Sequence, residues 1–219
     1  RRQRQMCIRD RYGVESFVDN GDIHILAVMQ KDMTLPPYYA ELGHAIPSGV
    51  KEELEIKVKT CVYRAICALG VNHGSVNMDL LITNGGNVHI IDIGARMGGN
   101  LIGSHIVPIG TGIDYMGNMI RAAVSDPTCW KPECQPRSVA TKLLALTPGK
   151  VKELPDFDQI SSKYDVQIEH HLHVGDAITP YRTNLDGCGY VVSCGYDVDN
   201  CIALATDVRK VIDESIIRE

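Results

Sequence analysis

Two aspartates at matching distances from a glycine pair are the residues of this sequence best suited to chemistry. Asp79 lies five residues before Asn84, Asp92 lies five residues after Asn87, and Gly85-Gly86 stands between the two asparagines. Two carboxylates held side by side repel one another unless a cation lies between them. The pair therefore indicates a metal site; the alternative is that both carboxylates are merely solvated on an outer face.

A β-hairpin would position these carboxylates. The runs on either side, residues 74–83 and 88–96, are apolar and rich in β-branched side chains, and glycine supplies the positive φ of a tight hairpin turn. If Asn84 pairs with Asn87 across a two-residue loop, Asp79 and Asp92 lie directly opposite, with Cβ atoms about 5 Å apart. A three-residue loop would break this pairing.

The alternation of side chains along a strand predicts what shares each face. Ser75 and Asn77 should lie on the face of Asp79, and Arg96 on the face of Asp92. The other face should be directed toward the core, and it carries an apolar set: Met78, Leu80, Ile82, His89, Ile91 and Ile93.

The segment after the hairpin carries a family resemblance. Residues 90–100 read Ile-Ile-Asp-Ile-Gly-Ala-Arg-Met-Gly-Gly-Asn, and Gly-Thr-Gly-Ile-Asp follows at 110–114. This order of strand acid, arginine, glycine-rich loop and Gly-x-Asp resembles the signature of the ATP-grasp superfamily. Residues 12–18 resemble the strand of this superfamily that carries a Val-Glu pair, and residues 38–48 resemble a segment typical of its carboxylate–amine ligase branch, the L-amino-acid-ligase-like proteins. The resemblance covers residues 12–125 well and continues more weakly to the C-terminus.

The resemblance implies an ATP-dependent ligase that joins a small-molecule carboxylate to an amine through an acyl phosphate. Its cofactors would be ATP and magnesium (Mg²⁺), with Asp79 and Asp92 as the metal ligands. Arg96 matches the catalytic arginine that contacts the anionic substrate or the acyl-phosphate intermediate. The resemblance places a further group of residues in the ATP- and substrate-binding cleft: Glu15, Lys31, Glu41, His44, Gly98, Gly99 and Asn100.

Two departures from the family pattern bear on this hypothesis. The family usually has Glu where this chain has Asp79 and Asp92, and the shorter side chain would hold an ion closer to the sheet or partly through water. Gly94 stands where the family commonly has Asn, which removes one oxygen ligand; Asn77 and Asn100 are the candidates to replace it.

Several of these residues have a structural alternative. His44 could hydrogen-bond to loop backbone, Lys31 could be a solvated strand-end lysine, and Glu15 could form a surface salt bridge. Gly98-Gly99 could be a plain turn, and Asp114 could cap the helix that follows it.

Two other functions also remain open. One is a non-catalytic nucleotide- or protein-binding module of the same fold, and the other is a two-carboxylate metal hydrolase that uses an activated water and no nucleotide. Phosphate release from ATP that requires both a carboxylic acid and an amine would distinguish the ligase from both.

Composition restricts the partners. The 219 residues carry a net charge of −5 and are 44% hydrophobic, which is against a nucleic-acid-binding surface. No apolar run is long enough for a transmembrane helix, so we expect neither nucleic acid nor a membrane as a partner. The eight cysteines contain no Cys-x-x-Cys and match no zinc spacing, which favours a reduced, cytoplasmic compartment. A homodimer is left open.

The pattern of elements predicts an α+β fold: an antiparallel sheet with flanking helices, the C-terminal lobe of an ATP-grasp fold, followed by a small β-rich subdomain. We expect a non-native or disordered tail at 1–11, the catalytic lobe at 12–126 and the C-terminal subdomain at 127–219. Strands are predicted at 14–18, 23–30, 139–145, 166–173 and 189–193, and helices at 50–69 (capped by Ser48 and ended by Gly70), 113–124 and 198–217. A loop-rich stretch is expected at 34–47 and a loop at 96–105. The last helix should carry one apolar face, formed by Ile202, Ala205, Val208 and Ile212.

The first eleven residues are polar and Arg-rich and do not begin with Met. We expect that the chain starts inside a larger enzyme, whose preceding lobe would supply phosphate-binding lysines and most of the adenine pocket. The isolated chain should then bind Mg-ATP weakly or not at all.

Overall fold

The computed structural model describes residues 10–219, so residues 1–9 of the expected tail lie outside the described part. The first strand, β1 (Asp10–Asp19), already begins inside the range expected for the tail. The described chain forms two compact units. The first consists of the residues up to Lys31 together with Ile46–Arg137, and the second of Asp32–Ala45 together with Ser138–Glu219. The fold is α+β and dominated by antiparallel strands, as the sequence predicts.

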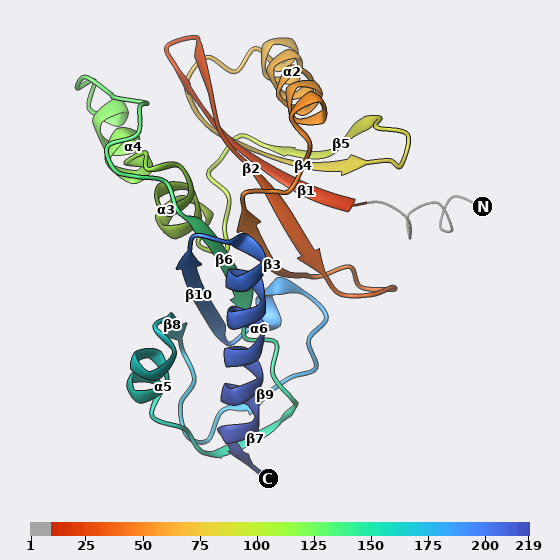
Figure 1. The fold of residues 1–219 in the computed structure, drawn as a ribbon, viewed down its shortest axis with the longest axis vertical. Helices are drawn as coiled ribbons and strands as arrows, with labels where there is room; N and C mark the ends of the chain where they lie inside the picture. The colour runs from red at the N-terminus through yellow and green to blue at the C-terminus, as the bar shows by residue number, and fades with distance from the viewer. Residues whose placement is uncertain (1–9) are drawn as a thin grey trace. The chain divides into compact units, whose positions relative to one another are not determined.

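The first unit is built on four antiparallel strands (Figure 1). Their order is β5-β4-β1-β2, with β2 at Asp22–Met33, β4 at Gly74–Ile82 and β5 at Val88–Gly94. Asn20 (φ 50°) and Gly21 (φ 96°) form the turn between β1 and β2, where positive φ is required of both residues. The strands predicted at 14–18 and 23–30 are confirmed.

One face of this sheet is covered by α2 (Glu52–Leu69). Val58, Val62 and Ile66 recur at helical spacing and are fully buried against the strand side chains. Burying one such side chain contributes about 1.5–3 kcal/mol. The α2 face and the sheet face therefore supply the apolar core of the unit.

The predicted end of α2 is confirmed and its predicted start is wrong. Gly70 ends the helix in the left-handed conformation (φ 67°). The helix begins at Glu52 with Lys51 at the N-cap, and the Ser48 hydroxyl accepts from the Val50 N–H (3.4 Å) in the preceding turn. Ser48 lies too far from Glu52 to cap the helix.

Helices follow the hairpin sooner than predicted. The sequence predicts a loop through His105, but a π-helical segment, η2 (Ile102–Ile106), runs directly into α3 (Val107–Thr111). Its apolar side chains Ile102 and Ile106 are buried, which explains why this segment coils instead of crossing the surface. α4 (Tyr115–Ala123) lies within the predicted 113–124 helix, and Asp114 caps it by accepting from the Gly117 N–H (2.9 Å).

The second unit contains four neighbouring antiparallel strands, a separate three-stranded sheet and their helices (Figure 1). The four strands have the order β3-β6-β10-β8, and the three-stranded sheet has the order β11-β7-β9. Four of these strands and both helices of the unit have the bounds β3 Glu41–Ile46, β6 Ser138–Leu143, β8 Gln167–His170, β10 Gly189–Gly195, α5 Phe157–Tyr164 and α6 Val198–Ser215. The short elements are β7 Gly149–Glu153, β9 Ala177–Ile178, β11 Ile217–Arg218 and a 3₁₀ turn at Asn184–Asp186.

The core of the second unit lies under α6. Ala205, Val208 and Ile212 are fully buried and pack with Val191 of β10, which confirms the apolar face predicted for the last helix. The strands predicted at 139–145, 166–173 and 189–193 are confirmed with shorter or shifted ends, whereas α5, β7, β9 and β11 were not predicted.

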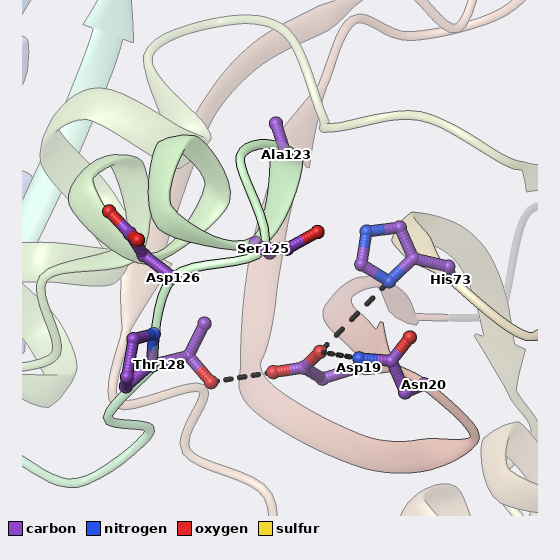
Figure 2. Close-up of a pocket in the computed structure, with 9 residues that line it drawn as sticks. Asp19, Asn20, His73, Ala123, Ser125, Asp126 and Thr128 are labelled. Atoms are coloured by element: carbon purple, nitrogen blue, oxygen red, sulfur yellow. Dashed lines mark hydrogen bonds and ion pairs between the residues drawn. The ribbon is translucent and has the colours of Figure 1, made fainter.

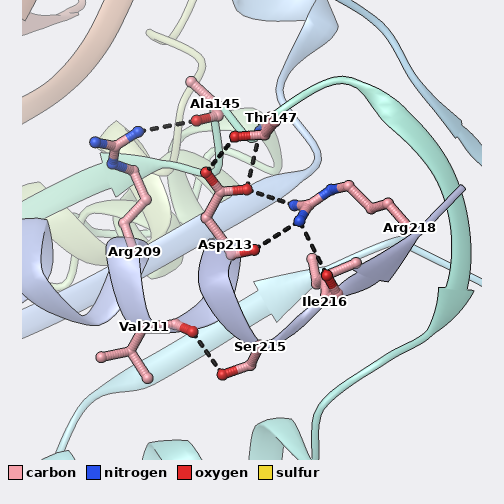
Figure 3. Close-up of polar contacts among 8 residues, drawn as sticks. All are labelled: Ala145, Thr147, Arg209, Val211, Asp213, Ser215, Ile216 and Arg218. Carbon is pink, nitrogen blue, oxygen red and sulfur yellow. Dashed lines mark hydrogen bonds and ion pairs between the residues drawn. The ribbon is translucent and has the colours of Figure 1, made fainter.

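A network of hydrogen bonds connects the last strand, β11, to α6 (Figure 3). Thr147 donates to the Asp213 carboxylate through its N–H (2.9 Å) and its hydroxyl (2.8 Å). The Arg218 guanidinium also donates to this carboxylate, and to the backbone oxygens of Asp213 (2.7 Å) and Ile216 (3.0 Å). Asp213 therefore connects the segment after β6 with the C-terminal strand. In residues 10–219, no helix combines the length and the apolar character that crossing a membrane requires.

Candidate active site

The hairpin of β4 and β5 holds the two aspartates opposite one another. Asp79 of β4 pairs with Asp92 of β5, and the two strands are antiparallel. Paired positions on adjacent strands direct their side chains to the same face, with Cβ atoms about 5 Å apart. The predicted pairing is therefore confirmed.

The loop that joins the strands differs from the prediction. The Thr83 N–H donates to the Asn87 carbonyl (3.0 Å), so three residues, Asn84–Gly86, form the loop, and Gly86 takes the positive φ (71°). A three-residue loop shifts the pairing by one, so that Leu80 lies opposite Ile90. A β-bulge at Ile91 then inserts one extra residue and restores the pairing of the aspartates.

The side chains of β5 do not all lie on the faces predicted for them. Met78, Leu80 and Ile82 of β4 are buried, as predicted. On β5, Val88, Ile90 and Ile93 pack against the core, whereas His89 is exposed and Ile91 is 47% exposed. The prediction that His89 and Ile91 face the core is wrong, because the longer loop moves every residue before the bulge to the other face.

Lys31 lies beside the first aspartate. Its Nζ is 2.7 Å from Asp79 Oδ1, and its side chain is only 4% exposed, against 30% for Asp79. Gly13 of β1 lies between the two strands, opposite Asp79. A Cβ at Gly13 would stand 3.3 Å from Met29 Cε and in ordinary van der Waals contact, 3.6 Å, with Lys31 Cδ, so the lysine passes directly over β1 at this position. The structure thus joins two residues that the sequence named separately.

The aspartate pair fits Mg²⁺ as a two-carboxylate site. Within residues 10–219 no group of three or more His, Cys, Asp or Glu side chains is arranged to hold a metal ion. Magnesium, however, is usually bound through one or two carboxylates, with water and substrate phosphate oxygens as the remaining ligands. Asp79 and Asp92 supply that donor set.

A loop of residues 95–100, the glycine loop, follows β5 directly. Arg96 is exposed, and its Nη1 donates to the Met97 carbonyl (2.9 Å). Gly98 is buried, whereas a Cβ added at the exposed Gly99 would meet no atom within 4 Å. Asn100 adopts positive φ (54°) at the start of the turn into η2. The loop therefore exposes a guanidinium and an uncrowded stretch of backbone close to Asp92 in the chain.

Glu15 is a buried carboxylate on the same face of the sheet. It pairs in register with Asn77, whose Nδ2 donates to Oε2 (2.8 Å). The Tyr115 hydroxyl donates to Oε1 (2.6 Å), and the Gly98 N–H lies 3.2 Å from both oxygens. Burial raises the pKa of Glu15 to about 7, because desolvation outweighs these hydrogen bonds.

Tyr115 was not identified from the sequence. It is fully buried at the first position of α4, and its pKa is raised by burial and by the neighbouring Glu15 carboxylate. Glu15 and Tyr115 are 100 residues apart in the chain, so no local pattern connects them.

Glu41 and His44 belong to the second unit, where they lie on β3. His44 Nε2 is 4.0 Å from Glu41 Oε2, and the His44 backbone N–H donates to the Thr141 hydroxyl (3.2 Å). The sequence predicts a loop here; the segment is a strand, because its backbone pairs within the sheet, and the imidazole is buried.

A separate polar cavity of about 570 Å³ lies in the first unit at the β1–β2 turn (Figure 2). The Thr128 hydroxyl donates to Asp19 Oδ2 (2.5 Å), and His73 Nδ1 lies 4.0 Å from Asp19 Oδ1. The hydrogen bond from Thr128 lowers the pKa of Asp19. None of the residues predicted for the active site lines this cavity.

Comparison with known families matches both parts of the chain. The profile of the ATP-grasp domain matches residues 7–104, which contain β1, β2, the aspartate hairpin and the glycine loop. Residues 7–104 are thus similar to an ATP-grasp domain. A second profile, L-amino acid ligase C-terminal domain 2, matches residues 142–214, in agreement with the predicted branch.

Solved structures share the ATP-grasp fold of the chain. An L-amino acid ligase from Bacillus licheniformis superposes with a TM-score of 0.82 at 22% identity, over 96% of this chain and 54% of that one. A phosphoribosylglycinamide synthetase from Anaerococcus prevotii gives 0.78 at 23%, over 95% and 53%. A biotin carboxylase from Campylobacter jejuni gives 0.70 at 15%, over 97% and 46%. The chain thus spans about half the length of these proteins. No curated protein sequence matches it.

Proposed function

We propose that the protein carrying this chain is an ATP-dependent ligase that forms a C–N bond between a small-molecule carboxylate and an amine. The observation that supports this best is the pairing of Asp79 with Asp92 on one face of an antiparallel hairpin, with Arg96 and the glycine loop directly after it. The ATP-grasp match and the L-amino acid ligase match on either side of this region agree with the proposal.

The reaction would proceed in two displacements. A carboxylate oxygen of the substrate attacks the γ-phosphorus of ATP and ADP leaves, which gives an acyl phosphate. The amine nitrogen then attacks the acyl carbon, phosphate leaves, and the nitrogen loses a proton. Mg²⁺ held by Asp79 and Asp92 would offset the negative charge of the ATP phosphates.

The residues of the glycine loop suit the anionic groups of this reaction. The exposed Arg96 guanidinium offers a planar fork of donors that matches carboxylate and phosphate oxygens. The backbone around the open Gly99 can approach an anion without a side chain in the way. We assign Arg96 the catalytic role of stabilising the acyl phosphate, and Gly98, Gly99 and Asn100 the role of shaping the loop.

Most of the remaining residues would bind ATP or substrates. Lys31, beside Asp79, would add positive charge near the phosphates. Glu41 and His44, which lie together on β3, would contact a substrate. Glu15, which the resemblance places with them, is fully buried and would support the site without contacting ATP or a substrate. We further propose a cytoplasmic enzyme, with a homodimer as the assembly to be tested and neither nucleic acid nor a membrane as a partner.

The alternative is a non-catalytic nucleotide- or protein-binding module of the same fold. The presence of Asp at both positions where the family usually has Glu, and of Gly94 where it commonly has Asn, favours this alternative. Binding of a nucleotide needs fewer metal ligands in fixed positions than phosphoryl transfer does.

The test is phosphate release from ATP in the natural protein, measured with a panel of carboxylic acids and amines. The ligase requires release that depends on both substrates and that falls at least about a hundredfold in Asp92→Asn. Asp126→Asn, which removes an exposed carboxylate of the same unit away from the hairpin, serves as the matched control and should keep the wild-type rate. ATP binding without release across the panel would support the binding module instead.

A further inference from the structure

Glu15 joins three elements of the first unit through one buried carboxylate. Its two oxygens accept hydrogen bonds from Asn77 Nδ2 of β4, from the Gly98 N–H of the glycine loop and from the Tyr115 hydroxyl at the start of α4. The side chain has no exposed surface. A buried carboxylate is stable only if donors replace the lost water, so these three contacts are strongly coupled.

The contact with the glycine loop is close. Both Glu15 oxygens lie 3.2 Å from the Gly98 nitrogen, and a Cβ at Gly98 would come within 2.9 Å of Oε2 and 2.7 Å of Asn77 Nδ2. Only a glycine lets the loop backbone approach the carboxylate this closely. The loop backbone at Gly98 therefore lies directly against the Glu15 carboxylate, with no side chain between them.

The same carboxylate reaches both halves of the proposed site. Asn77 precedes Asp79 by two residues on the same face of β4, and Gly98 follows Arg96 by two residues in the loop. Arg96 itself is exposed, and its guanidinium donates to the carbonyl of the neighbouring residue, Met97. The placement of Arg96 relative to Asp79 then depends on the Glu15 contacts.

We propose that Glu15 is a positioning residue: it accepts from Gly98 and Asn77 and thereby holds the Arg96 loop over the Asp79/Asp92 face, without itself contacting ATP or substrate. This inference rests on the proposed ligase function for its kinetic consequence. Its structural part, the dependence of the loop on the Glu15 acceptor, holds for the chain whatever it catalyses.

Two substitutions separate the acceptor from the volume it fills. Glu15→Gln keeps one oxygen, which can accept from Gly98 and Asn77, while its NH₂ donates to the Tyr115 hydroxyl, since a hydroxyl both donates and accepts. Glu15→Met keeps a similar volume but offers at most a weak acceptor. Val14→Ala, at the neighbouring position in the apolar core, controls for a general loss of stability.

The first measurement is amide hydrogen exchange of a peptide covering residues 95–100 in the 219-residue chain. We expect exchange to accelerate at least about tenfold in Glu15→Met, and to stay within about threefold of wild type in Glu15→Gln and Val14→Ala, because a lost buried hydrogen bond frees the loop locally. Equal exchange in the methionine and glutamine variants would overturn the proposal.

The second measurement is steady-state kinetics of ATP-dependent ligation in the natural protein. Glu15→Met should lower kcat about thirtyfold or more and change the KM for ATP less than about threefold, and Glu15→Gln should restore most of kcat, since misplacing a catalytic group costs up to about a hundredfold. A methionine variant with wild-type kcat would overturn the positioning role. If the wild-type protein catalyses no ligation, the proposed function fails, and the exchange experiment still decides the loop contact.

Discussion

Lys31 Nζ lies 2.7 Å from Asp79 Oδ1, and this pair connects β2 to β4 across Gly13 of the intervening strand. An ammonium group thus stands against one of the two carboxylates proposed to hold Mg²⁺. The lysine lowers the negative potential that a cation would meet at the pair, so the site should bind a metal ion weakly until phosphate oxygens add their own charge.

Removing this lysine should therefore strengthen metal binding by the chain alone. We expect Lys31→Met to raise the affinity for Mn²⁺, used as a paramagnetic substitute for Mg²⁺, by about tenfold, since a unit charge in contact with the carboxylate is worth about 1–2 kcal/mol at a partly exposed site. Spin-resonance titration without nucleotide measures it. Lys142→Met, which removes a similarly buried lysine paired with Asp32 in the second unit, is the matched control and should leave the affinity unchanged.

Arg96 should matter for catalysis and not for folding. It is exposed, and its guanidinium bonds only to the adjacent backbone among the contacts described here, so Arg96→Lys should change the free energy of unfolding by less than about 0.5 kcal/mol. The substitution keeps the charge but loses the planar fork, and kcat for ligation should fall about tenfold to a hundredfold. Urea unfolding and steady-state kinetics on the same preparation check both parts, and a wild-type kcat would exclude a role for the fork.

The two glycines of the loop should respond differently to the same added methyl group. At Gly98 a Cβ would come within 2.9 Å of Ile102 Cδ1 and of Glu15 Oε2, whereas at Gly99 it would meet nothing within 4 Å. We expect Gly98→Ala to lower the free energy of unfolding by about 1–3 kcal/mol, and Gly99→Ala to change it by less than about 0.5 kcal/mol. Denaturant midpoints of the two variants provide the comparison; equal midpoints would show that the loop relaxes around the methyl group.

Glu15 should make the stability of the chain depend on pH in an unusual direction for a carboxylate. Burial raises its pKa from 4.5 to about 7, so between these values the folded protein keeps a proton that the unfolded chain releases. The contribution of Glu15 to stability is therefore complete below pH 4.5 and is lost as the pH rises through about 7, in total about 3 kcal/mol. Urea unfolding at pH 5 and pH 8 should show a larger decrease in wild type than in Glu15→Gln. Parallel curves for the two proteins would mean that Glu15 does not titrate in this range.

The sequence predicts the parts of this site that depend on strand alternation and on recognisable segments. That Asn77 lies on the same face as Asp79 follows from the period of two along β4. Asp79 lies opposite Asp92 for a reason that the sequence did not predict, because the bulge at Ile91 offsets the three-residue loop. The length of the loop does not follow, because Gly85 and Gly86 are both compatible with two- and three-residue turns and packing of Val88 and Ile90 against the core decides between them.

Contacts between segments far apart in the chain could not be predicted from the sequence, for a different reason. Lys31 with Asp79, and Glu15 with Gly98 and Tyr115, join residues 48 to 100 positions apart. Each depends on which strands become neighbours in the sheet, and local propensity carries no information about that order. The burial of Glu15 is the clearest case, because a glutamate in a strand is ordinarily exposed.

Because of the bulge at Ile91, the strand pairing at the two aspartates does not depend on the number of residues in the hairpin turn alone. One residue in the turn is offset by one residue in the strand, and the correction lies between the tip and Asp92. The tip at Asn84–Gly86 is exposed or half-exposed and lies on the far side of that correction. Lineages of this fold could therefore shorten or lengthen the turn during evolution, provided that the bulge is lost or gained with it, while the two carboxylates stay face to face.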